Sequence, residues 1–467
     1  MKLLLFTLSE YGQANTVLAL AEELATRPEV QAIHICSFPA LCERVNTLPG
    51  SIQLHPLDGP TCMEAAAARG FTAESLPHQP TLKSTDVFRT FDMLLHVYGD
   101  ETYLALIDQC EMLLKMLEPD LVVVDMMCHF AADACRLLNR RYIINSPVNT
   151  LDIVRMSQPW LKGLWYYPAV FSGIPYPVPL TLFISNIAIS LMMIIIFMSN
   201  PGMRALPEFR AKSGLKGRHP MRFDPNIDTI CPAIEETDYP LVCPPNLHRF
   251  GPITLNAAPL YQSDPELKTW LDRRKTVVIG LGTHTIYSKD MINAFLHGLL
   301  DYLPAEMQVL WKVGKRDWSD EEIGAVGLDS ERFRIVRWII SEPIAVMEHP
   351  NVVAYVHHGG ANSFFECCLA GVPQIITAMW GDLYDNACKA EYRGIGVFGN
   401  RSVAPRVDAM EFGQALTRVV GPGPDATQMK ENAMRISQLC RKAGGKKVAV
   451  DFILSMAAKG KQYIHQT

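Results

Sequence analysis

Residues 338–387 read WIISEPIAVMEHPNVVAYVHHGGANSFFECCLAGVPQIITAMWGDLYDNA. Within this stretch the apolar run VVAYV has the composition of a buried strand, and a helical pattern begins just after HHGG. A strand that passes through a glycine-rich turn into a helix is typical of α/β proteins with parallel sheets. Such sheets bind ligands at the carboxyl ends of their strands. The loop from His358 to Ser363 is therefore the first candidate for a binding site.

The same alternation of apolar strands and helical patterns extends along the chain. In the first half, KLLLFTL, AIHICSF, DLVVVD and RYIIN alternate with helical stretches, and TVVIGLG at Thr276 begins a second series. A proline-rich, apolar stretch from Ser146 to about Pro252 separates the two series. Short continuous apolar strands between helices predict an α/β fold with two units, each built on a parallel sheet, and a crevice between them.

Composition limits the functions that the chain can have. The 467 residues are 49% hydrophobic and 19% charged, which is ordinary core content with low charge. With 43 Lys and Arg against 48 Asp and Glu, the net charge of −5 provides no basic surface for nucleic acid. We therefore expect a two-domain globular protein that does not bind nucleic acid.

The low charge is concentrated in one segment. No Asp, Glu, Lys or Arg lies between Lys162 and Arg204, and residues 180–198 read LTLFISNIAISLMMIIIFM. This length is close to the roughly 20 residues that span a bilayer. Three interpretations stay open: a membrane-spanning helix, a helix that lies on a membrane or walls a pocket for an apolar ligand, and a buried core helix.

Two features indicate a cytoplasmic protein, or one on the cytosolic face of a membrane. The start, MKLLLFTLSEYG, has too short an apolar run for a secretory signal and is expected to form a buried strand. The 12 cysteines are scattered without a CxxC pair, which favours free thiols over disulfides. We expect no metal site, because clusters of His and carboxylates with ligand spacing are missing from the sequence.

The turn after VVAYV carries groups that suit a phosphorylated ligand. Gly360 and the glycine before it permit close approach of the backbone, and a helix beginning near Asn362 or Ser363 directs its N–H groups at an anion. His358 and the Ser363 hydroxyl supply two further hydrogen-bond donors. Glu366 lies three residues after Ser363 on the same helix face, where it can accept hydrogen bonds from a sugar diol.

This constellation resembles the donor-binding signature of the family 1 UDP-dependent glycosyltransferases, and the similarity extends over most of the chain. The resemblance implies the GT-B fold, in which two Rossmann-like domains face each other. It implies that residues 1–248 form the acceptor-binding domain and 249–440 the UDP-sugar-binding domain. Residues 441–467 are then expected to form a C-terminal helix that crosses back to the first domain. RFGPIT, from Arg249, resembles the family's linker, and PDLVVVDMMCHFAADA resembles the strand whose Asp supports the catalytic base.

The resemblance also implies roles for individual residues on the donor side. Trp338 would stack on the uracil, because an aromatic plane suits a base. Glu366 would bind the ribose hydroxyls, and Asp382 would bind hydroxyls of the sugar. The other donor-side residues expected from the resemblance are Thr283 in GLGTH, Ser341, His358, Gly360, Asn362, Ser363 and Leu383.

Two of these positions depart from the family's pattern. Ser341 stands where the family commonly has Gln, and Leu383 stands where it has Gln or His. Leu383 offers no hydrogen bond to a sugar hydroxyl. Glucose is the default donor sugar, with glucuronate, xylose and N-acetylglucosamine as alternatives.

The catalytic base departs from the pattern as well. Inverting transfer needs a group that takes the proton of the acceptor hydroxyl, and the family uses the His of a Gly-His-x-x-Pro loop, oriented by an Asp. Here Gln13 stands in the His position and Thr16 in the Pro position, and an amide is not a base at physiological pH. Three explanations stay open: Asp125 is the base, His129 substitutes for it, or the acceptor is acidic enough to need little help. Gln13 would orient an acceptor hydroxyl or a sugar oxygen.

The expected reaction is inverting transfer of a sugar, by default from UDP-glucose, to a hydroxyl of an apolar small molecule. Candidate acceptors are the phenols, polyketides, flavonoids and terpenoids of secondary metabolism. Two alternatives remain. One is a membrane-associated sterol or lipid glycosyltransferase that contacts a membrane surface through residues 180–198. The other is a catalytically silent UDP-sugar-binding protein, which Gln13 keeps open.

Overall fold

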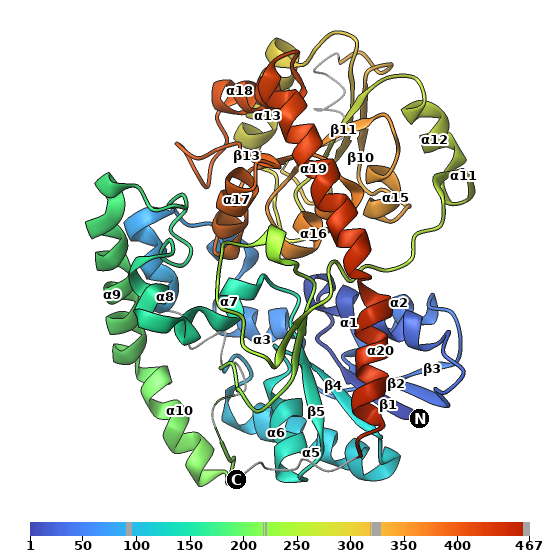
Figure 1. Ribbon diagram of the computed structural model, residues 1–467, viewed down its shortest axis with the longest axis vertical. Helices are drawn as coiled ribbons and strands as arrows, with labels where there is room; N and C mark the ends of the chain where they lie inside the picture. Colours follow the sequence, from blue (N-terminus) through green and yellow to red (C-terminus); the bar gives the residue numbers. More distant parts are fainter. Residues whose placement is uncertain (90–95, 218, 220–221, 318, 320–327, 461–467) are drawn as a thin grey trace.

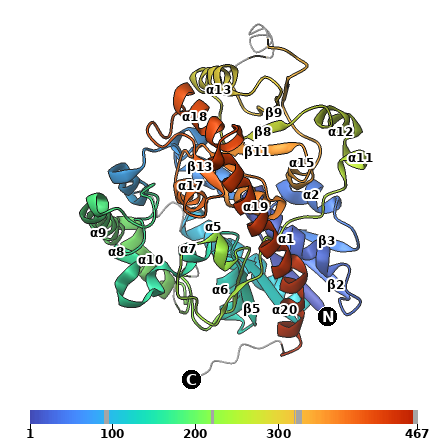
Figure 2. The ribbon, with the colours of Figure 1, turned by 45° about the horizontal axis from the view of Figure 1, so that its top comes forward.

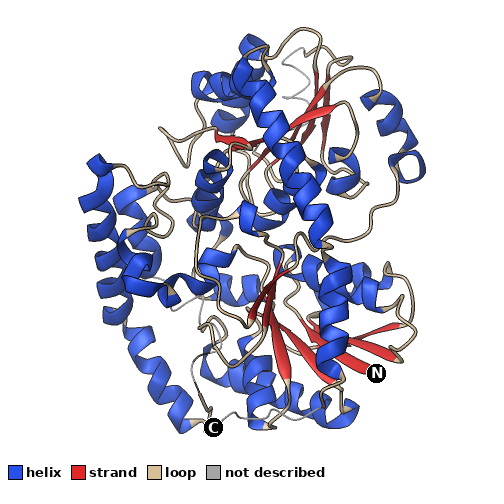
Figure 3. Ribbon diagram, in the orientation of Figure 1, coloured by secondary structure: helices blue, strands red, loops and turns tan. Residues whose placement is uncertain are grey.

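The computed structural model describes residues 1–89, 96–217, 219, 222–317, 319 and 328–460. Its strands form two separate parallel sheets, one in the lower half and one in the upper half of Figure 3, with helices on both faces of each sheet. The predicted α/β fold with two Rossmann-like domains is thereby confirmed.

The first sheet explains why its strands are apolar without alternation. In β1 (Lys2–Phe6), Leu3 and Leu5 pack toward the helices α1 (Tyr11–Leu24) and α20 (Lys446–Ala457). Leu4 and Phe6 pack toward α5 (Gly99–Leu117) and α6 (His129–Leu137), so that both faces of the pleat are buried. In spatial order the strands are β3 (Ile52–Pro56), β2 (Ala32–Ser37), β1 (Lys2–Phe6), β4 (Leu121–Asp125), β5 (Tyr142–Asn145), β6 (Thr229–Cys231) and β7 (Leu247–Arg249).

The second sheet repeats the arrangement. In β8, Val277 and Ile279 pack with α13 and α18, and Val278 packs on the opposite face with α12 and α15. In spatial order the strands are β10 (Phe333–Val336), β9 (Gln308–Lys312), β8 (Thr276–Gly280), β11 (Val352–His357), β12 (Gln374–Ile376) and β13 (Gly396–Phe398).

The helices connect these strands and cover the two sheets (Figure 1). Those of the first half are α1 (Tyr11–Leu24), α2 (Cys42–Asn46), α3 (Cys62–Ala68), α5 (Gly99–Leu117), α6 (His129–Leu137), α7 (Thr150–Val154), α8 (Lys162–Trp165), α9 (Phe183–Ser199) and α10 (Pro201–Lys212). Those of the second half are α11 (Leu260–Ser263), α12 (Pro265–Leu271), α13 (Lys289–Tyr302), α15 (Pro343–Met347), α16 (Ala361–Ala370), α17 (Asp382–Tyr392), α18 (Ala409–Val420), α19 (Pro424–Ala443) and α20 (Lys446–Ala457).

The end of the chain passes from the second domain to the first. Helix α19 packs on α16, and α20 continues in nearly the same direction and packs on α1 (Figure 1). The junction at Gly444 and Gly445 has positive φ at both residues, and a Cβ on Gly445 would lie 2.5 Å from the carbonyl oxygen of Pro252. Of the segment expected to cross back, residues 461–467 lie outside the described residues. The first sheet continues to Arg249, one residue past the boundary expected at 248.

The apolar segment forms an outer helix and not a core helix. Within the described residues, Leu180–Ser199 is the one helix long and apolar enough to cross a bilayer, and most of it is not buried. Helix α9 lies at the periphery beside α8 in both Figure 1 and Figure 2. The interpretation of residues 180–198 as a buried core helix is therefore wrong, because one side of the helix packs on no part of the described chain.

A buried ion cluster fastens the two domains together. The Lys389 side chain, on α17, is 1% exposed, and its Nζ lies 3.4 Å from Oδ2 of Asp152 and 3.9 Å from Oδ1 of Asp238. Both carboxylates belong to the first half of the chain. Although loss of water opposes its charge, these carboxylates raise the pKa of Lys389 above its ordinary value. The ammonium is therefore charged, and it fixes α17 against the first domain.

The Lys389 cluster predicts a large loss of stability when the cation is removed. Lys389→Met leaves the buried Asp238 carboxylate without its cation and also removes the partner of the more exposed Asp152, which should cost about 3–5 kcal/mol of unfolding free energy. Lys268→Met, at the exposed pair of Lys268 and Asp272, is the control and should cause no measurable change. Chemical denaturation followed by circular dichroism measures both variants. Equal midpoints for Lys389→Met and the control would contradict the prediction.

Candidate active site

Asp125 ends β4 at the edge of the first sheet that faces the second domain. Its side chain is 0% exposed, and its two oxygens accept hydrogen bonds from the Met127 backbone N–H (2.9 Å) and the Thr7 hydroxyl (3.1 Å). Loss of water raises the pKa of Asp125 to about 7, although these hydrogen bonds oppose the rise. Asp125 is thus a fully enclosed carboxyl whose hydrogen bonds fix its orientation.

Gln13 lies in the first turn of α1, directly after β1. Its Oε1 is buried and has no hydrogen-bond partner in the protein, while its backbone carbonyl accepts a hydrogen bond from the Thr16 hydroxyl (3.2 Å). Thr16 in turn accepts a hydrogen bond from Asn145 on β5 (2.8 Å). The Gln13 amide oxygen is therefore available to a bound group. Its predicted role in orienting an acceptor hydroxyl or a sugar oxygen stays a prediction.

His129 is the first residue of α6 and lines a pocket of the first domain. Its ring lies 4.7 Å from the ring of His219, centroid to centroid. The pocket has an empty volume of about 260 Å³ and is otherwise lined by apolar and aromatic side chains with one thiol: Leu8, Cys62, Val97, Tyr98, Tyr103, Met127 and Phe130. His129 thus faces an apolar pocket next to Asp125, and its role as a base stays a prediction.

The turn after β11 is shaped by glycines. Gly359 has φ of +101°, and a Cβ there would lie 2.9 Å from the Leu383 carbonyl oxygen. The His358 ring packs between two other glycines, because a Cβ on Gly282 or Gly360 would approach it to 2.6 and 2.7 Å. The glycines therefore make room for the imidazole, whose buried Nδ1 has no hydrogen-bond partner in the protein.

The groups of this turn that can bind an anion are uncharged hydrogen-bond donors. Loss of water lowers the pKa of His358 to about 3, so that the imidazole is neutral at physiological pH. Gly360 is the N-cap of α16, and Asn362 and Ser363 follow in its first turn. The backbone N–H groups of this turn provide the positive end of the helix dipole. Thr283 lies in the facing turn after β8.

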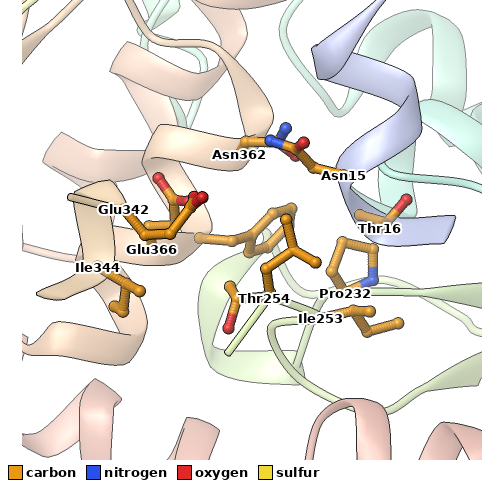
Figure 4. Close-up of a pocket in the computed structure, with 11 residues that line it drawn as sticks. Asn15, Thr16, Pro232, Ile253, Thr254, Glu342, Ile344, Asn362 and Glu366 are labelled. Carbon is orange, nitrogen blue, oxygen red and sulfur yellow. The ribbon is translucent and has the colours of Figure 1, made fainter. Parts of the chain in front are cut away.

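The N-termini of α1 and α16 meet across the two domains. The Asn362 side chain donates a hydrogen bond to the Tyr11 backbone carbonyl, with Nδ2 and O 3.2 Å apart. A pocket with an empty volume of about 400 Å³ opens beside this contact. Figure 4 shows Asn15 and Thr16 of the first domain on one side and Asn362, Glu366 and Glu342 of the second domain on the other. The structure therefore brings the sequence-predicted turn of each domain to one interdomain site.

Glu366 lies among charges from both domains. Loss of water, with a smaller effect of Glu342, raises the pKa of Glu366 to about 8, and Lys312 and Arg44 oppose the rise. Glu342 forms an ion pair across the domains with Arg44 (2.7 Å). The Glu366 carboxyl is therefore poised to ionise when a ligand donates hydrogen bonds to it.

Trp338 lies at the rim of the second sheet. Its ring is 56% exposed, and the Lys312 ammonium lies 4.6 Å from the ring centroid. Ile340, two residues later, is 79% exposed. Ser341 is buried instead, and its hydroxyl is hydrogen-bonded to that of Ser263 (2.8 Å). Trp338 is thus available to a flat ligand, whereas the Ser341 side chain is occupied within the protein.

Asp382 is the first residue of α17, and its charged neighbours are Asp152 of the first domain and Lys389. Loss of water raises the pKa of Asp382 to about 6. The Leu383 side chain is buried in an apolar cluster made by both domains, and its backbone lies near the turn of Gly359. The preceding residue, Gly381, donates its N–H to Nε2 of His78 (2.7 Å), which belongs to a first-domain loop. The donor-side residues predicted on α16 and α17 therefore lie on adjoining helices, and the first domain holds the start of α17 in place.

Two residues of this site were not predicted from the sequence: Lys312 and His78. Lys312 ends β9, and the rule that ligands bind at the carboxyl ends of strands would have indicated it. His78 lies on a loop, and its position in the site depends on how distant segments pack. Within the described ranges, no group of three or more His, Cys, Asp or Glu has an arrangement suited to a metal ion.

Comparison with known proteins places these features in a family. Residues 228–448 match the family model described as UDP-glucoronosyl and UDP-glucosyl transferase. Glycosyltransferase sdnJ from Sordaria araneosa is 34% identical over 504 residues, an alignment that covers 97% of this chain and 97% of that protein. The chain belongs to the UDP-glycosyltransferase family. It is a glycosyltransferase, and the predicted family and enzyme class are confirmed.

Solved structures show that the transferase has the fold of this family's members. A UDP-glucosyltransferase from Polygonum tinctorium, capable of glucosylating indoxyl, superposes with a TM-score of 0.67 at 15% identity over 98% of both chains. The glycosyltransferase VinC, solved in complex with dTDP, gives a TM-score of 0.63 at 15% identity and covers 98% of this chain. Both similarities confirm the GT-B fold, with two Rossmann-like domains.

The raised pKa of Glu366 predicts how nucleotide binding depends on pH. If ribose hydroxyls of UDP donate to the carboxylate, binding lowers this pKa from about 8, and the affinity rises as pH increases toward it. Between about pH 7 and pH 9 we expect the affinity for UDP, measured by calorimetry, to rise up to tenfold. This range lies above the phosphate pKa of about 6, so the charge of UDP stays constant. Glu366→Gln should bind more weakly and lose this rise. An equal slope in the variant would show that another group titrates.

Proposed function

We propose that this transferase moves glucose from UDP-glucose to a hydroxyl of an apolar small molecule, with inversion at the sugar carbon. The observation that carries the proposal is the meeting of the α1 and α16 N-termini at one interdomain pocket. Two convergent rows of backbone N–H groups suit a diphosphate that gains charge as it leaves. The diphosphate would lie near His358, Asn362 and Ser363, with Gly360 and Thr283 allowing its approach.

The second domain is proposed to hold the donor. The exposed Trp338 ring provides a stacking surface for uracil, and Glu366 provides an acceptor for the ribose hydroxyls. Asp382 would accept hydrogen bonds from the hydroxyls of the sugar. Since Ser341 is paired with Ser263 and Leu383 is buried, neither side chain is assigned a donor contact. Glucose is proposed because it is the default sugar of the family pattern that these residues match.

The first domain is proposed to hold the acceptor. Its pocket beside Asp125 combines aromatic rings, a thioether and a thiol, which accommodate flat or irregular apolar molecules. The Tyr98 hydroxyl is buried without a hydrogen-bond partner in the protein, so it is available to an acceptor oxygen. A phenol, polyketide, flavonoid or terpenoid of secondary metabolism fits this chemistry. All twelve cysteines are free thiols, which is consistent with a proposed cytoplasmic location.

A donor screen tests the proposal. Purified protein is incubated with 4-methoxyphenol and, separately, the UDP forms of glucose, glucuronate, xylose and N-acetylglucosamine, and mass spectrometry detects the product. We expect a hexose adduct from UDP-glucose.

Trp338→Ala should weaken UDP binding by about 1–3 kcal/mol, the range of base stacking, whereas Ile340→Ala, the nearby exposed control, should not. UDP binding without turnover of any donor, over phenolic and sterol acceptors, would instead indicate a silent UDP-sugar-binding protein.

A second candidate function, transfer to a sterol or other lipid at a membrane surface, is favoured by the polarity of α9. Polar Asn186 and Ser190 face the protein, and Asn186 bonds the backbone of Tyr167 and Ala169. The outward stripe is apolar at helical spacing, with Ile184 82% exposed and Ala188, Leu191, Ile195 and Met198 following it. Surface helices of soluble proteins turn their apolar side to the core and their polar side to water.

The surroundings of α9 fit a lipid surface. The loop before α8 presents Trp160, which is 85% exposed, and the neighbouring Leu161, and both have positive φ. No Asp or Glu lies between Asp152 and Glu208, whereas Lys162 and Arg204 lie there with side chains that are not buried. A coiled-coil pairing with a second copy would need flanking charges to fix its register, and α9 has none. The proposed contact is therefore with the interface of an anionic membrane.

Sedimentation with vesicles tests this candidate. We expect the wild-type protein to pellet with vesicles of phosphatidylcholine and phosphatidylserine and the double variant Ile184→Gln, Ile195→Gln to stay in solution, because burial of apolar area drives the binding. A matched control, Met410→Gln with Met434→Gln, changes two exposed apolar residues of the second domain and should pellet normally. A wild-type protein that never pellets, or that dimerises through α9 instead, would refute the membrane contact.

A further inference from the structure

Asp125 is poorly placed to take a proton from an acceptor. It is fully buried, and both of its oxygens accept hydrogen bonds from the protein, one from Met127 and one from Thr7. A general base must come within hydrogen-bond reach of the proton that it removes. Asp125 exposes no surface to an acceptor hydroxyl, and Gln13 has no basic atom. A base other than Asp125 is therefore sought among the groups that can reach an acceptor, which are His129 and the carboxylates near α1.

Glu10 is the residue that precedes α1. It occupies the N-cap position, yet its side chain does not cap the helix. Its Oε1 accepts a hydrogen bond from the Met63 backbone N–H of α3, with 3.1 Å between N and Oε1. Its Oε2 is buried and has no hydrogen-bond partner in the protein. One oxygen thus fixes the carboxylate, and the other stays free to accept a proton.

Other unsatisfied polar atoms lie shortly after Glu10 in the chain or face it. The Gln13 and Asn15 amide oxygens and the Tyr98 hydroxyl, which is close enough to Glu10 for their charges to interact, are also buried without a partner in the protein. Burial of an unpaired polar atom costs about 1–3 kcal/mol, so each of them is available to a polar ligand. Asn15 lines the interdomain pocket and Tyr98 lines the first-domain pocket. Glu10 belongs to the segment that joins the two.

The electrostatic surroundings of Glu10 favour a base over a permanent anion. Loss of water raises the pKa of Glu10, with Glu64 of α3 adding to the rise and the Met63 N–H opposing it. Glu10 in turn adds to the raised pKa of Asp125 on β4. Toward the first-domain pocket it faces the Cys62 thiol and the Tyr98 phenol, whose pKa values it raises further. A carboxylate with a raised pKa holds an accepted proton better.

The geometry points to Glu10 as the catalytic base that removes the proton from the acceptor hydroxyl, with Asp125 as a positioning residue that orders the loop after β1. The inference rests on the proposed function and goes beyond it by assigning the base. The position of Glu10, three residues before Gln13, places a carboxylate on the same loop where the family pattern has its histidine. Glu10 thereby takes the role of the missing histidine from a position three residues before it.

The proposed step balances without a further reactant. The acceptor O–H bond breaks as its proton moves to Oε2 of Glu10, and the oxygen forms a bond to the anomeric carbon of the sugar. The bond from that carbon to the diphosphate oxygen breaks, and its electron pair leaves with the nucleoside diphosphate. The N-terminus of α16 stabilises the charge of the leaving group. Glu10 then releases the proton to water.

Acceptors of graded acidity test the assignment. The full-length wild-type protein, Glu10→Gln and Asp125→Asn are assayed with UDP-glucose and four para-substituted phenols: 4-nitrophenol, 4-cyanophenol, phenol and 4-methoxyphenol. Glu10→Gln should lose about 10²-fold or more in kcat with 4-methoxyphenol, the usual contribution of a general base, and only a few-fold with the acidic 4-nitrophenol. The acid limb of its pH profile should disappear, and KM for UDP-glucose should stay unchanged. Glu101→Gln, at an exposed carboxylate of α5 outside both pockets, is the control and should keep the wild-type kcat with all four phenols.

Each outcome decides between the hypotheses. If the wild-type protein transfers sugar and Glu10→Gln loses activity equally with all four phenols, or not at all, the inference fails while the proposed function stands. An acidity-dependent loss in Asp125→Asn alone would assign the base to Asp125. If the wild-type protein transfers to no acceptor, the proposed function itself fails. Circular dichroism and UDP binding establish folding, and Glu10→Asp, which keeps a shorter carboxylate, should retain part of the wild-type response to acceptor acidity.

Discussion

The contact between the N-termini of α1 and α16 is the constraint on which the site depends. Both helices follow a central strand of their sheet, so each directs the positive end of its dipole at the same interdomain pocket. The positive ends of the two helix dipoles repel each other, and an anion bound between them is attracted by both. The domains must therefore be held together by other means. The buried Lys389 cluster and the ion pair of Arg44 with Glu342 supply them.

The proposed donor half of the site could be predicted from the sequence because one stretch of chain carries most of its residues. Strand β11, the glycine turn and the start of α16 follow one another, and local periodicity with glycine chemistry is enough to place His358, Asn362 and Glu366 at a strand end. Their predicted roles follow from the residue types. What the sequence could not show was the state of each group, since the raised pKa of Glu366 and the lowered pKa of His358 arise from burial.

The acceptor half was predicted less completely because it is assembled from distant segments. Asp125 was placed correctly at the end of β4, but its complete enclosure by hydrogen bonds from Thr7 and Met127 has no signature in the sequence. Glu10 gives no local signal, since an acidic residue before a helix is ordinary N-cap chemistry. Only the packing of α3 against the loop after β1 shows that one of its oxygens is held and the other is free.

The sequence by itself determined the two parallel sheets and the family, because apolar strands, helical periodicity and the glycine turn are local properties of the chain. It also determined that residues 180–198 are apolar, but not which way they face. The tertiary structure decided that α9 turns Asn186 inward and Ile184 outward, and that Asn15 and Thr16 of the first domain meet Asn362 and Glu366 of the second at one pocket. The physical reason is that exposure, charge state and proximity depend on the neighbours that packing supplies, and no local sequence pattern contains them.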